Sequence, residues 1–329
     1  MIKFLGNAIL VKIRARYAKR LYDNDYKMLL SCDSVTDIAL YLKSKQLYSD
    51  SVSKMIREKV HREKLEEALM QSFFEDLSCL ANYDLKFSKR IFKYILVRSE
   101  IKKIGRFLIF LKSGNSKNFQ SPLPRALQSK SKINFSELCT VNTYDELLSR
   151  TMRSEYYKIL CSCNEDGDFD INIVETSLYN YLFDVLLSLV YKFAFSSLQS
   201  IKKFLYDYVD IINVIRILRV RKIFNAPENY ISRIIFQFGD YKFGKNDLSE
   251  SNLKELFGRD VSNISDLEKL SKIIRFNWAK HNIRYSNIAE VIGISYILLR
   301  EIEIMNVTNI VEGVRYNLDR KKIEEMLIK

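Results

Sequence analysis

Residues 208–219 read YVDIINVIRILR, and residues 301–313 read EIEIMNVTNIVEG. In each stretch an acidic residue precedes Ile, and further apolar residues follow three, six and seven positions after that Ile. These offsets place the apolar side chains on one broad face of an α-helix. A more divergent copy occupies residues 100–112, where Lys103 replaces the Asn that the other two copies share. Each copy therefore predicts an amphipathic helix, here called an acid-Ile helix, that packs against the rest of the protein.

The three acid-Ile helices share a set of packing positions and a basic end. A basic residue stands twelve positions after each acid, at Lys112, Lys222 and Arg315. Because three copies occur in one chain, we expect three related helical domains. The residues predicted to pack in the core are Ile101, Ile104, Leu108, Ile211, Val214, Leu218, Ile304, Val307 and Val311.

A second repeated pattern, here called a capped segment, precedes each acid-Ile helix. It consists of a short helix, a loop and an N-cap. The short helices are predicted at residues 24–30, 134–138 and 249–257, and the caps read DSVTD at 33–37, NTYDE at 142–146 and SNISD at 262–266. In each cap Ser, Thr or Asn can accept hydrogen bonds from free helix amides, and an acid follows in the first turn.

The order of these elements predicts the domain organisation. The acids that open the copies are 110 and 93 residues apart, as 210 − 100 and 303 − 210 show, which excludes a regular short-period solenoid. We expect domains at 1–120, including a basic first helix at about residues 4–23, at 121–242 and at 243–329. A linker is predicted at 113–132, a break near 239–246 and a polar loop at 163–170.

The composition indicates a globular, nearly all-helical protein. The chain has 329 residues, 47% of them hydrophobic, with only nine Gly and three Pro to break helices. Its formal charge of +13 is compatible with a polyanionic partner, an anionic membrane surface or an acidic protein. The five cysteines are odd in number and scattered, which favours reduced thiols in a cytosolic protein without a secretory signal. Charged residues interrupt the most apolar region, 174–201, so it predicts a buried helix rather than a membrane span.

The sequence offers no pattern for catalysis or for cofactor binding. The two histidines, His61 and His281, lie in different predicted domains, which leaves neither a two-His metal site nor a Ser-His-acid triad. Residues 164–170 alternate Asp as a calcium loop does, but Ile171 stands where Gly is required. Phosphate-binding GxxxxGK[ST] and GxGxxG motifs and a GxSxG nucleophile motif are missing. We therefore expect no catalytic residue, no metal, no cofactor and no enzymatic activity.

Together these stretches resemble the C subunit of archaeal and bacterial V/A-type rotary ATPases, which is related to the vacuolar d subunit. The likeness lies in Gly6-Asn7-Ala8 with its following basic residues, in 208–219, in 301–313 and in the tail at 316–327. It implies an all-α, funnel-shaped protein of three related helical domains with pseudo-threefold symmetry. It also implies a non-catalytic rotor subunit at the cytoplasmic face of the membrane, peripheral and without a span of its own. Its partners would be the proteolipid ring and the central stalk subunits, and the coupling ion, H⁺ or Na⁺, stays open.

Two further hypotheses concern polar side chains. Exposed cations are candidate partner-docking residues, although basic side chains at helix ends also complement the helix dipole. These candidates are Arg14, Arg16, Arg219, Arg221, Lys222 and Arg315. For Asn213 and Asn306 we expect a hydrogen bond to a neighbouring helix. The alternative function, suggested by the charge and the many aromatic residues, is that of a basic helical nucleic-acid-binding protein.

Overall fold

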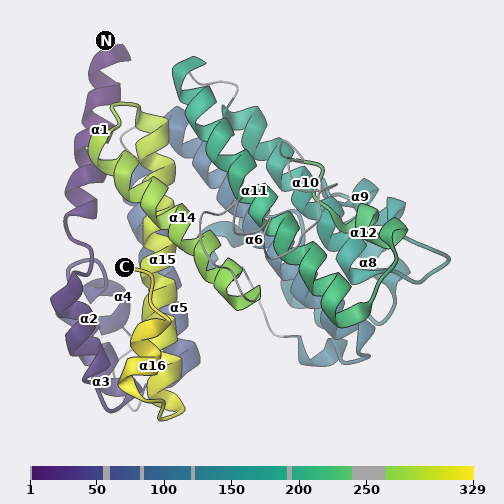
Figure 1. Cartoon of the computed structure of the whole chain (residues 1–329), viewed down its shortest axis with the longest axis horizontal. Coiled ribbons are helices and arrows are strands. Elements are labelled where there is room, and N and C mark those ends of the chain that lie inside the picture. The colour runs from purple at the N-terminus through teal and green to yellow at the C-terminus, as the bar shows by residue number, and fades with distance from the viewer. Residues whose placement is uncertain (1, 55–59, 82–84, 120–122, 191–194, 239–263) are drawn as a thin grey trace. The chain divides into compact units, whose positions relative to one another are not determined.

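The computed structural model describes residues 2–54, 60–81, 85–119, 123–190, 195–238 and 264–329 (Figure 1). Across these ranges the chain folds into helices and forms no β-strand, apart from one isolated bridge between Glu165 and Asp168. The predicted all-α class is confirmed. The residues separate into two compact units, Met1–Lys89 with Lys272–Lys329, and Arg90–Ser271.

Unit 1 is built around α15 (Ala289–Arg315), which contains the third acid-Ile sequence. Its apolar side chains lie on most sides of the helix and are buried, as expected of a helix surrounded by others. It packs against α1, α2, α3, α5 and α16. The other helices of this unit are α1 (Ile2–Tyr17), α2 (Asp23–Leu30), α3 (Val35–Lys43), α4 (Ser49–Ser53), α5 (Arg62–Ala81), most of α14 (Ile264–Tyr285) and α16 (Arg320–Glu325).

Unit 2 contains the first and second acid-Ile sequences, in α6 (Leu85–Lys112) and α11 (Phe195–Phe224). Helices α10, α11 and α12 pack on one another, and α9 packs on both α8 and α10. A cluster of Ile217, Val220, Ile231 and Ile234 joins α11 to α12. The remaining elements are the 3₁₀ helices η1 (Ser116–Asn118) and η2 (Phe135–Thr140) and the helices α7 (Arg125–Gln128), α8 (Tyr144–Thr151), α9 (Tyr157–Ser162), α10 (Ile171–Val190) and α12 (Glu228–Ile234).

Two of the three predicted N-caps are present as expected. The Ser34 hydroxyl accepts a hydrogen bond from the amide of Asp37 at 3.1 Å, and the Thr143 hydroxyl accepts one from the amide of Glu146 at 3.2 Å. Residues 249–263 of the third capped segment, with the cap residues Ser262 and Asn263, and the predicted break at 239–246 lie outside the described residues. The first helix, expected to reach residue 23, ends at Tyr17. Beyond it the amides of Lys19 and Arg20 bond to carbonyls three residues back, and the amide of Leu21 bonds to the side chain of Glu303.

The stretch 113–132 is not the open linker that its Gly, Pro and Ser content predicted. Phe119, Leu123 and Leu127 are 3%, 3% and 0% exposed, and the Phe119 ring meets the edge of Phe107 on α6 at 5.2 Å. These apolar side chains anchor the segment to unit 2. Their regular spacing therefore indicates the packing of this segment better than its Gly, Pro and Ser content does. Residues 163–170 do form a polar loop, with Asp166 and Gly167 at positive φ.

The residues that follow the first and second caps contact the acid-Ile helix of another copy. The helix that follows the first cap leads to Tyr48, whose hydroxyl bonds to Glu303 of the third copy. The helix that follows the second cap leads to Tyr156, whose hydroxyl bonds to Glu100 of the first copy. Both tyrosines directly precede a short helix, α4 or α9, and both are buried. A cap and the acid-Ile helix that follows it in the sequence are therefore not the pair that meets in space. The three domains with boundaries at 120 and 242 stay a prediction.

Candidate functional site

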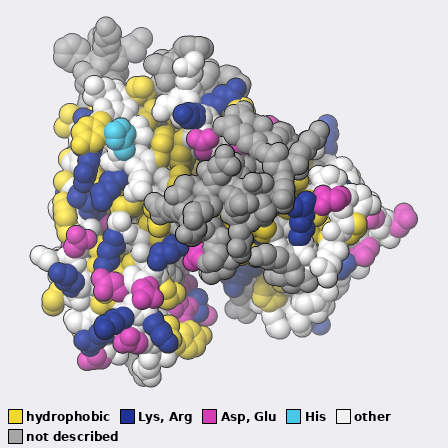
Figure 2. Space-filling model, in the orientation of Figure 1, with side chains coloured by type: hydrophobic (Ala, Val, Ile, Leu, Met, Phe, Trp, Pro, Cys, Tyr) yellow, Lys and Arg dark blue, Asp and Glu magenta, His cyan; other side chains and the backbone are white. Residues whose placement is uncertain are grey.

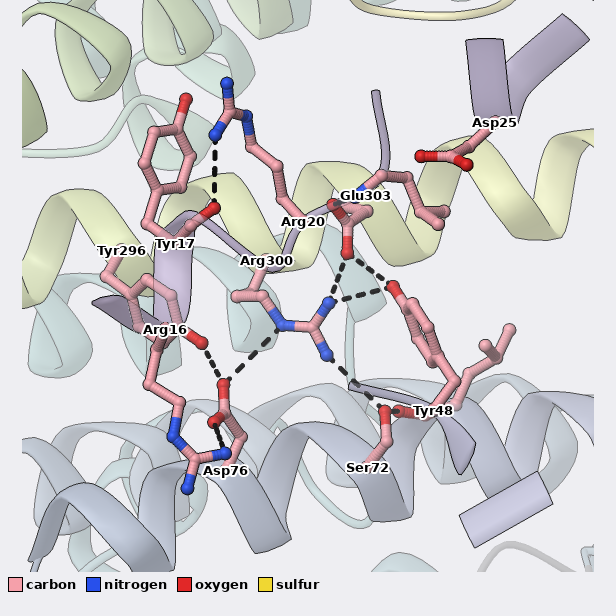
Figure 3. Close-up of polar contacts among 12 residues, drawn as sticks. Arg16, Tyr17, Arg20, Asp25, Tyr48, Ser72, Asp76, Tyr296, Arg300 and Glu303 are labelled. Atoms are coloured by element: carbon pink, nitrogen blue, oxygen red, sulfur yellow. Dashed lines mark hydrogen bonds and ion pairs between the residues drawn. The ribbon is translucent and has the colours of Figure 1, made fainter. Parts of the chain in front are cut away.

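A buried group of charged side chains lies at the centre of unit 1 (Figure 3). Arg300 and Glu303 stand one turn apart on α15 and are 1% and 6% exposed. The two side chains form an ion pair, and Arg300 Nη1 also donates to the Tyr48 hydroxyl at 2.8 Å. Glu303 Oε1 accepts from the Tyr48 hydroxyl at 2.5 Å, and Oε2 accepts from the Leu21 amide at 2.8 Å. Both oxygens of this carboxylate are therefore bonded within the unit.

Asp76 extends this group from α5. Its carboxylate lies 3.0 Å from Arg16 Nη1 and 3.8 Å from Arg300 Nε, and it accepts a hydrogen bond from the Tyr296 hydroxyl. We call Arg16, Asp76, Arg300 and Glu303 the charge quartet. Two cations and two anions alternate in it, so its formal charge is zero. It links α1, α5 and α15 through side chains (Figure 3).

The surroundings of the charge quartet keep each charge compensated. Burial raises the pKa values of Tyr48 and Tyr296 well above the usual range, so both phenols act as neutral donors. Burial opposes the charge of Arg300, but the carboxylates of Glu303 and Asp76 favour it, and the pKa of Arg300 is raised. Taking Asp76, Arg300 and Glu303 out of water is costly, while Arg16 stays partly exposed, and the mutual attraction offsets that cost only while all four charges are present. The arrangement favours one defined packing of the three helices.

The first copy keeps the acid but lacks the buried arginine. Glu100 accepts hydrogen bonds at 2.6 Å from the hydroxyls of Tyr156 and Ser131. The position three residues before it, which corresponds to Arg300, is Val97, buried at 1% exposure. Burial raises the pKa of Glu100, and the two hydroxyl donors oppose that shift. A shared position in the repeat thus has different electrostatic surroundings in the two units.

The shared asparagines hold main chain that comes later in the sequence. Asn213 Nδ2 donates to the carbonyl of Phe236 at 3.1 Å, and its Oδ1 accepts from the amide of Phe236 at 2.9 Å. Asn306 does the same with Ile328, at 2.7 and 2.9 Å. The expected internal hydrogen bond exists, but the prediction of a neighbouring helix as partner is wrong, because both partners follow the ends of α12 and α16. Lys103 has no acceptor atom, so the first copy cannot form this pair of bonds.

Two of the candidate docking residues lie on α1, and both have partners inside unit 1. Arg14 donates from Nε to the carbonyl of Ile283 at 3.0 Å and from Nη2 to those of Arg284 and Ser286 at 3.2 and 2.6 Å. These carbonyls are at the end of α14 and just beyond it, where carbonyls lack helical partners. Arg16 belongs to the charge quartet.

The other candidates lie near the ends of the second and third acid-Ile sequences. Arg219 pairs with Glu268, and Arg221 pairs with Glu228 at 2.7 Å. Arg315 is 3.9 Å from Glu312 and lies over the ring of Tyr316. The side chain of Lys222 lies outside the described residues. A docking role for these cations stays a prediction. The nine predicted packing residues are all buried, at 8% exposure or less.

Sequence reasoning missed Arg300 and Asp76 as a linked pair. A signal for Arg300 exists, since it is the one charge in the run SYILLR and lies a turn before the acid of the third copy. Nothing in the local sequence identifies Asp76 as its partner, because the two residues are 224 positions apart, as 300 − 76 shows. Among the described residues no group of three His, Cys, Asp or Glu side chains is placed to hold a metal ion.

The long buried helices and the polar links between them define an all-α scaffold. The family model described as ATP synthase (C/AC39) subunit matches residues 9–326, and the chain belongs to this family. It is thus a V/A-type ATPase subunit of the C/d kind, as the resemblance predicted, in a family of structural, generally non-catalytic subunits. A direct search of curated proteins finds no match.

Hydropathy adds one finding about the helices. Within the described ranges, no helix combines the length and the apolar character that crossing a bilayer requires.

Proposed function

We propose that this subunit is a non-catalytic rotor adaptor that joins the central stalk to the membrane rotor ring and transmits torque between them. In this role it sits at the cytoplasmic face of the membrane as a peripheral part of the complex, and its activity supports ATP-coupled transport of protons or sodium ions. The observation that carries the proposal is the family match over residues 9–326.

The physical construction of both units supports this role. An adaptor under torque must resist bending and keep its packing fixed. Helices α6, α11 and α15 contain 28, 30 and 27 residues, and at about 1.5 Å per residue each extends roughly 40–45 Å. The charge quartet fixes three helices in unit 1, and the asparagine pairs hold the segments that follow α12 and α16. Close packing of this kind transmits strain instead of absorbing it.

A pull-down of the full-length tagged chain from detergent-solubilised membranes tests the proposal. We expect the proteolipid ring and the central stalk subunits to be recovered together, with or without nuclease treatment. Recovery of RNA alone, with binding that falls steeply as salt is raised, would instead support the nucleic-acid-binding alternative. The test uses a matched sample without the tagged chain to identify background proteins.

The docking role of the exposed cations is a separate proposal with its own test. Arg219→Glu combined with Arg221→Glu should weaken reassembly of the ATPase head with the ring, measured by sedimentation of the reassembled complex. Both side chains are partly exposed, and their ion pairs with Glu268 and Glu228 contribute at most about 1 kcal/mol each. Arg150→Glu is a matched control, because Arg150 forms a similar exposed pair in the same unit. If the wild type, the double variant and the Arg150→Glu control reassemble equally well, the docking role is excluded.

A further inference from the structure

A cavity of about 200 Å³ lies within unit 1 beside the charge quartet, and Arg300 and Glu303 form part of its wall. Its walls come from the end of α1, the start of α2, α14, α15 and residues 328–329. A buried water needs only about 10–15 Å³ by this kind of measure, so the space can hold a small molecule. Aromatic side chains, among them Tyr22, Tyr26 and Phe276, form part of its wall.

The charged side chains that line this cavity are mainly cations. Besides Arg300, which is paired inside the unit, Arg20, Lys280, Arg284 and Lys329 line it from three segments: the residues after α1, helix α14 and the C-terminal residues. Lys329 is paired with Glu324, but in the part of the chain that the structure describes Arg20, Lys280 and Arg284 form no ion pair with an acid. Two acids also line the cavity: Asp23, which is exposed, and Glu303, whose oxygens are both used inside the unit. Figure 2 shows Lys and Arg side chains gathered over the lower part of α1 and over α14.

The side chain of one of these cations, Arg20, is held in place before any ligand binds. The guanidinium group of Arg20 lies between two rings, 4.2 Å from the centre of Tyr17 and 4.1 Å from that of Tyr22. Its Nη1 donates to the Tyr17 carbonyl and the Tyr22 hydroxyl at 3.2 and 3.1 Å (Figure 3 draws Tyr17 and Arg20). The main chain of Arg284 is held by Arg14, which donates to its carbonyl. The Arg20 side chain therefore needs little further ordering when an anion binds.

The Tyr17 hydroxyl lies within the field of both arginines. Burial raises the pKa of Tyr17, while the positive charges of Arg20 and Arg284 oppose this shift. Tyr17 thus stays a neutral phenol, and its hydroxyl can donate a hydrogen bond to an anion in the cavity that Arg20 and Arg284 also line. A neutral donor beside two arginines and a lysine suits an anion with several oxygens.

We propose that this cavity is a binding site for a phosphoryl group of a small anion, with Arg20, Lys280 and Arg284 as its ligands. Arginine forks match phosphate oxygens in pairs, and lysine adds a point charge. A phosphate group carries roughly 1.5–2 negative charges at neutral pH, which suits three cations better than a single carboxylate does. The group can belong to a free phosphate compound or to a lipid headgroup.

Calorimetric titration of the full-length protein with sodium pyrophosphate at low ionic strength tests the proposal. We expect saturable binding, weakened at least about tenfold by Lys280→Gln combined with Arg284→Gln, since each change removes a charge-assisted hydrogen bond. Arg315→Gln combined with Lys322→Gln is the matched control, because it removes the same charge from unit 1 outside the cavity. Circular dichroism checks that all proteins stay folded.

Two further probes identify the source of the phosphoryl group. Titration with ATP and flotation with vesicles of phosphatidylglycerol in phosphatidylcholine distinguish a soluble compound from a lipid headgroup, and the cavity variant must lose whichever binding is seen. The proposal is overturned if none of the three probes binds, or if the control variant loses binding as much as the cavity variant does. Binding of a polyglutamate peptide without binding of any phosphate probe would also overturn it.

Discussion

Replacing Asn306 by Ala removes both hydrogen bonds that hold the main chain of Ile328, at 2.7 and 2.9 Å. Asn306 and Ile328 are 1% and 3% exposed, so the amide and the carbonyl of Ile328 would lose their partners in a buried setting. Each unsatisfied group costs about 1–3 kcal/mol, which sums to about 2–6 kcal/mol. We expect about 2–4 kcal/mol of lost unfolding free energy, because a segment after the last helix can move toward water.

Two measurements test Asn306→Ala, one of the stability of the whole protein and one of the Ile328 amide alone. Urea denaturation followed by circular dichroism measures the loss of unfolding free energy, and hydrogen exchange measures the protection of the Ile328 amide. Asn309→Ala is the matched control on the same helix, since Asn309 is partly exposed and makes only one longer bond, 3.3 Å to the carbonyl of Met326. The control should change stability by less than about 0.5 kcal/mol. The reasoning is refuted if Asn306→Ala matches this control, or if exchange at Ile328 is unchanged.

Four further changes test other parts of the structure. Arg300→Gln should cost about 3–5 kcal/mol of unfolding free energy in urea denaturation, because it leaves the buried carboxylate of Glu303 without its cation and that of Asp76 with Arg16 alone. Gly313→Ala should cost about 1–3 kcal/mol, since the new Cβ would lie 2.5 Å from the side chain of Ile323. Gly105→Ala has nothing within 4 Å of its Cβ, and in thermal melts it should stabilise by up to about 1 kcal/mol. Glu100→Gln should remove a pH dependence of stability. Because burial raises the pKa of Glu100, the wild type should lose stability relative to the variant as pH rises from about 4 through that raised pKa.

Each of these outcomes has a comparison that can contradict it. Arg275→Gln removes a partly exposed pair with Glu301 and should cost no more than about 1 kcal/mol, so an equal loss in Arg300→Gln would exclude a special role for the charge quartet. If the two Gly→Ala changes shift the melting temperature alike, the close contact at Gly313 is not limiting. If the stability difference between wild type and Glu100→Gln is constant with pH, Glu100 does not titrate as burial predicts.

Much of the helical structure follows from local sequence. The apolar offsets after Ile101, Ile211 and Ile304 predict long helices with one buried face, because helical periodicity depends only on neighbouring residues. The caps at Ser34 and Thr143 were likewise predictable, since the bonds they make span three residues. The family resemblance also follows from these stretches, because their order along the chain is a property of the sequence.

Only the tertiary structure decided which elements meet. Tyr48 and Glu303 are 255 residues apart and bond to each other, so the first capped segment joins the third acid-Ile helix rather than the first. Arg300 and its partner Asp76 on α5 are also far apart in sequence, as are Arg20 and Arg284, which line one cavity. The spacing of apolar residues in the sequence predicts which face of a helix is apolar, but it does not predict which other helix packs against that face. That choice depends on how all the faces pack together at once, and on which buried charges can be compensated in the packed state.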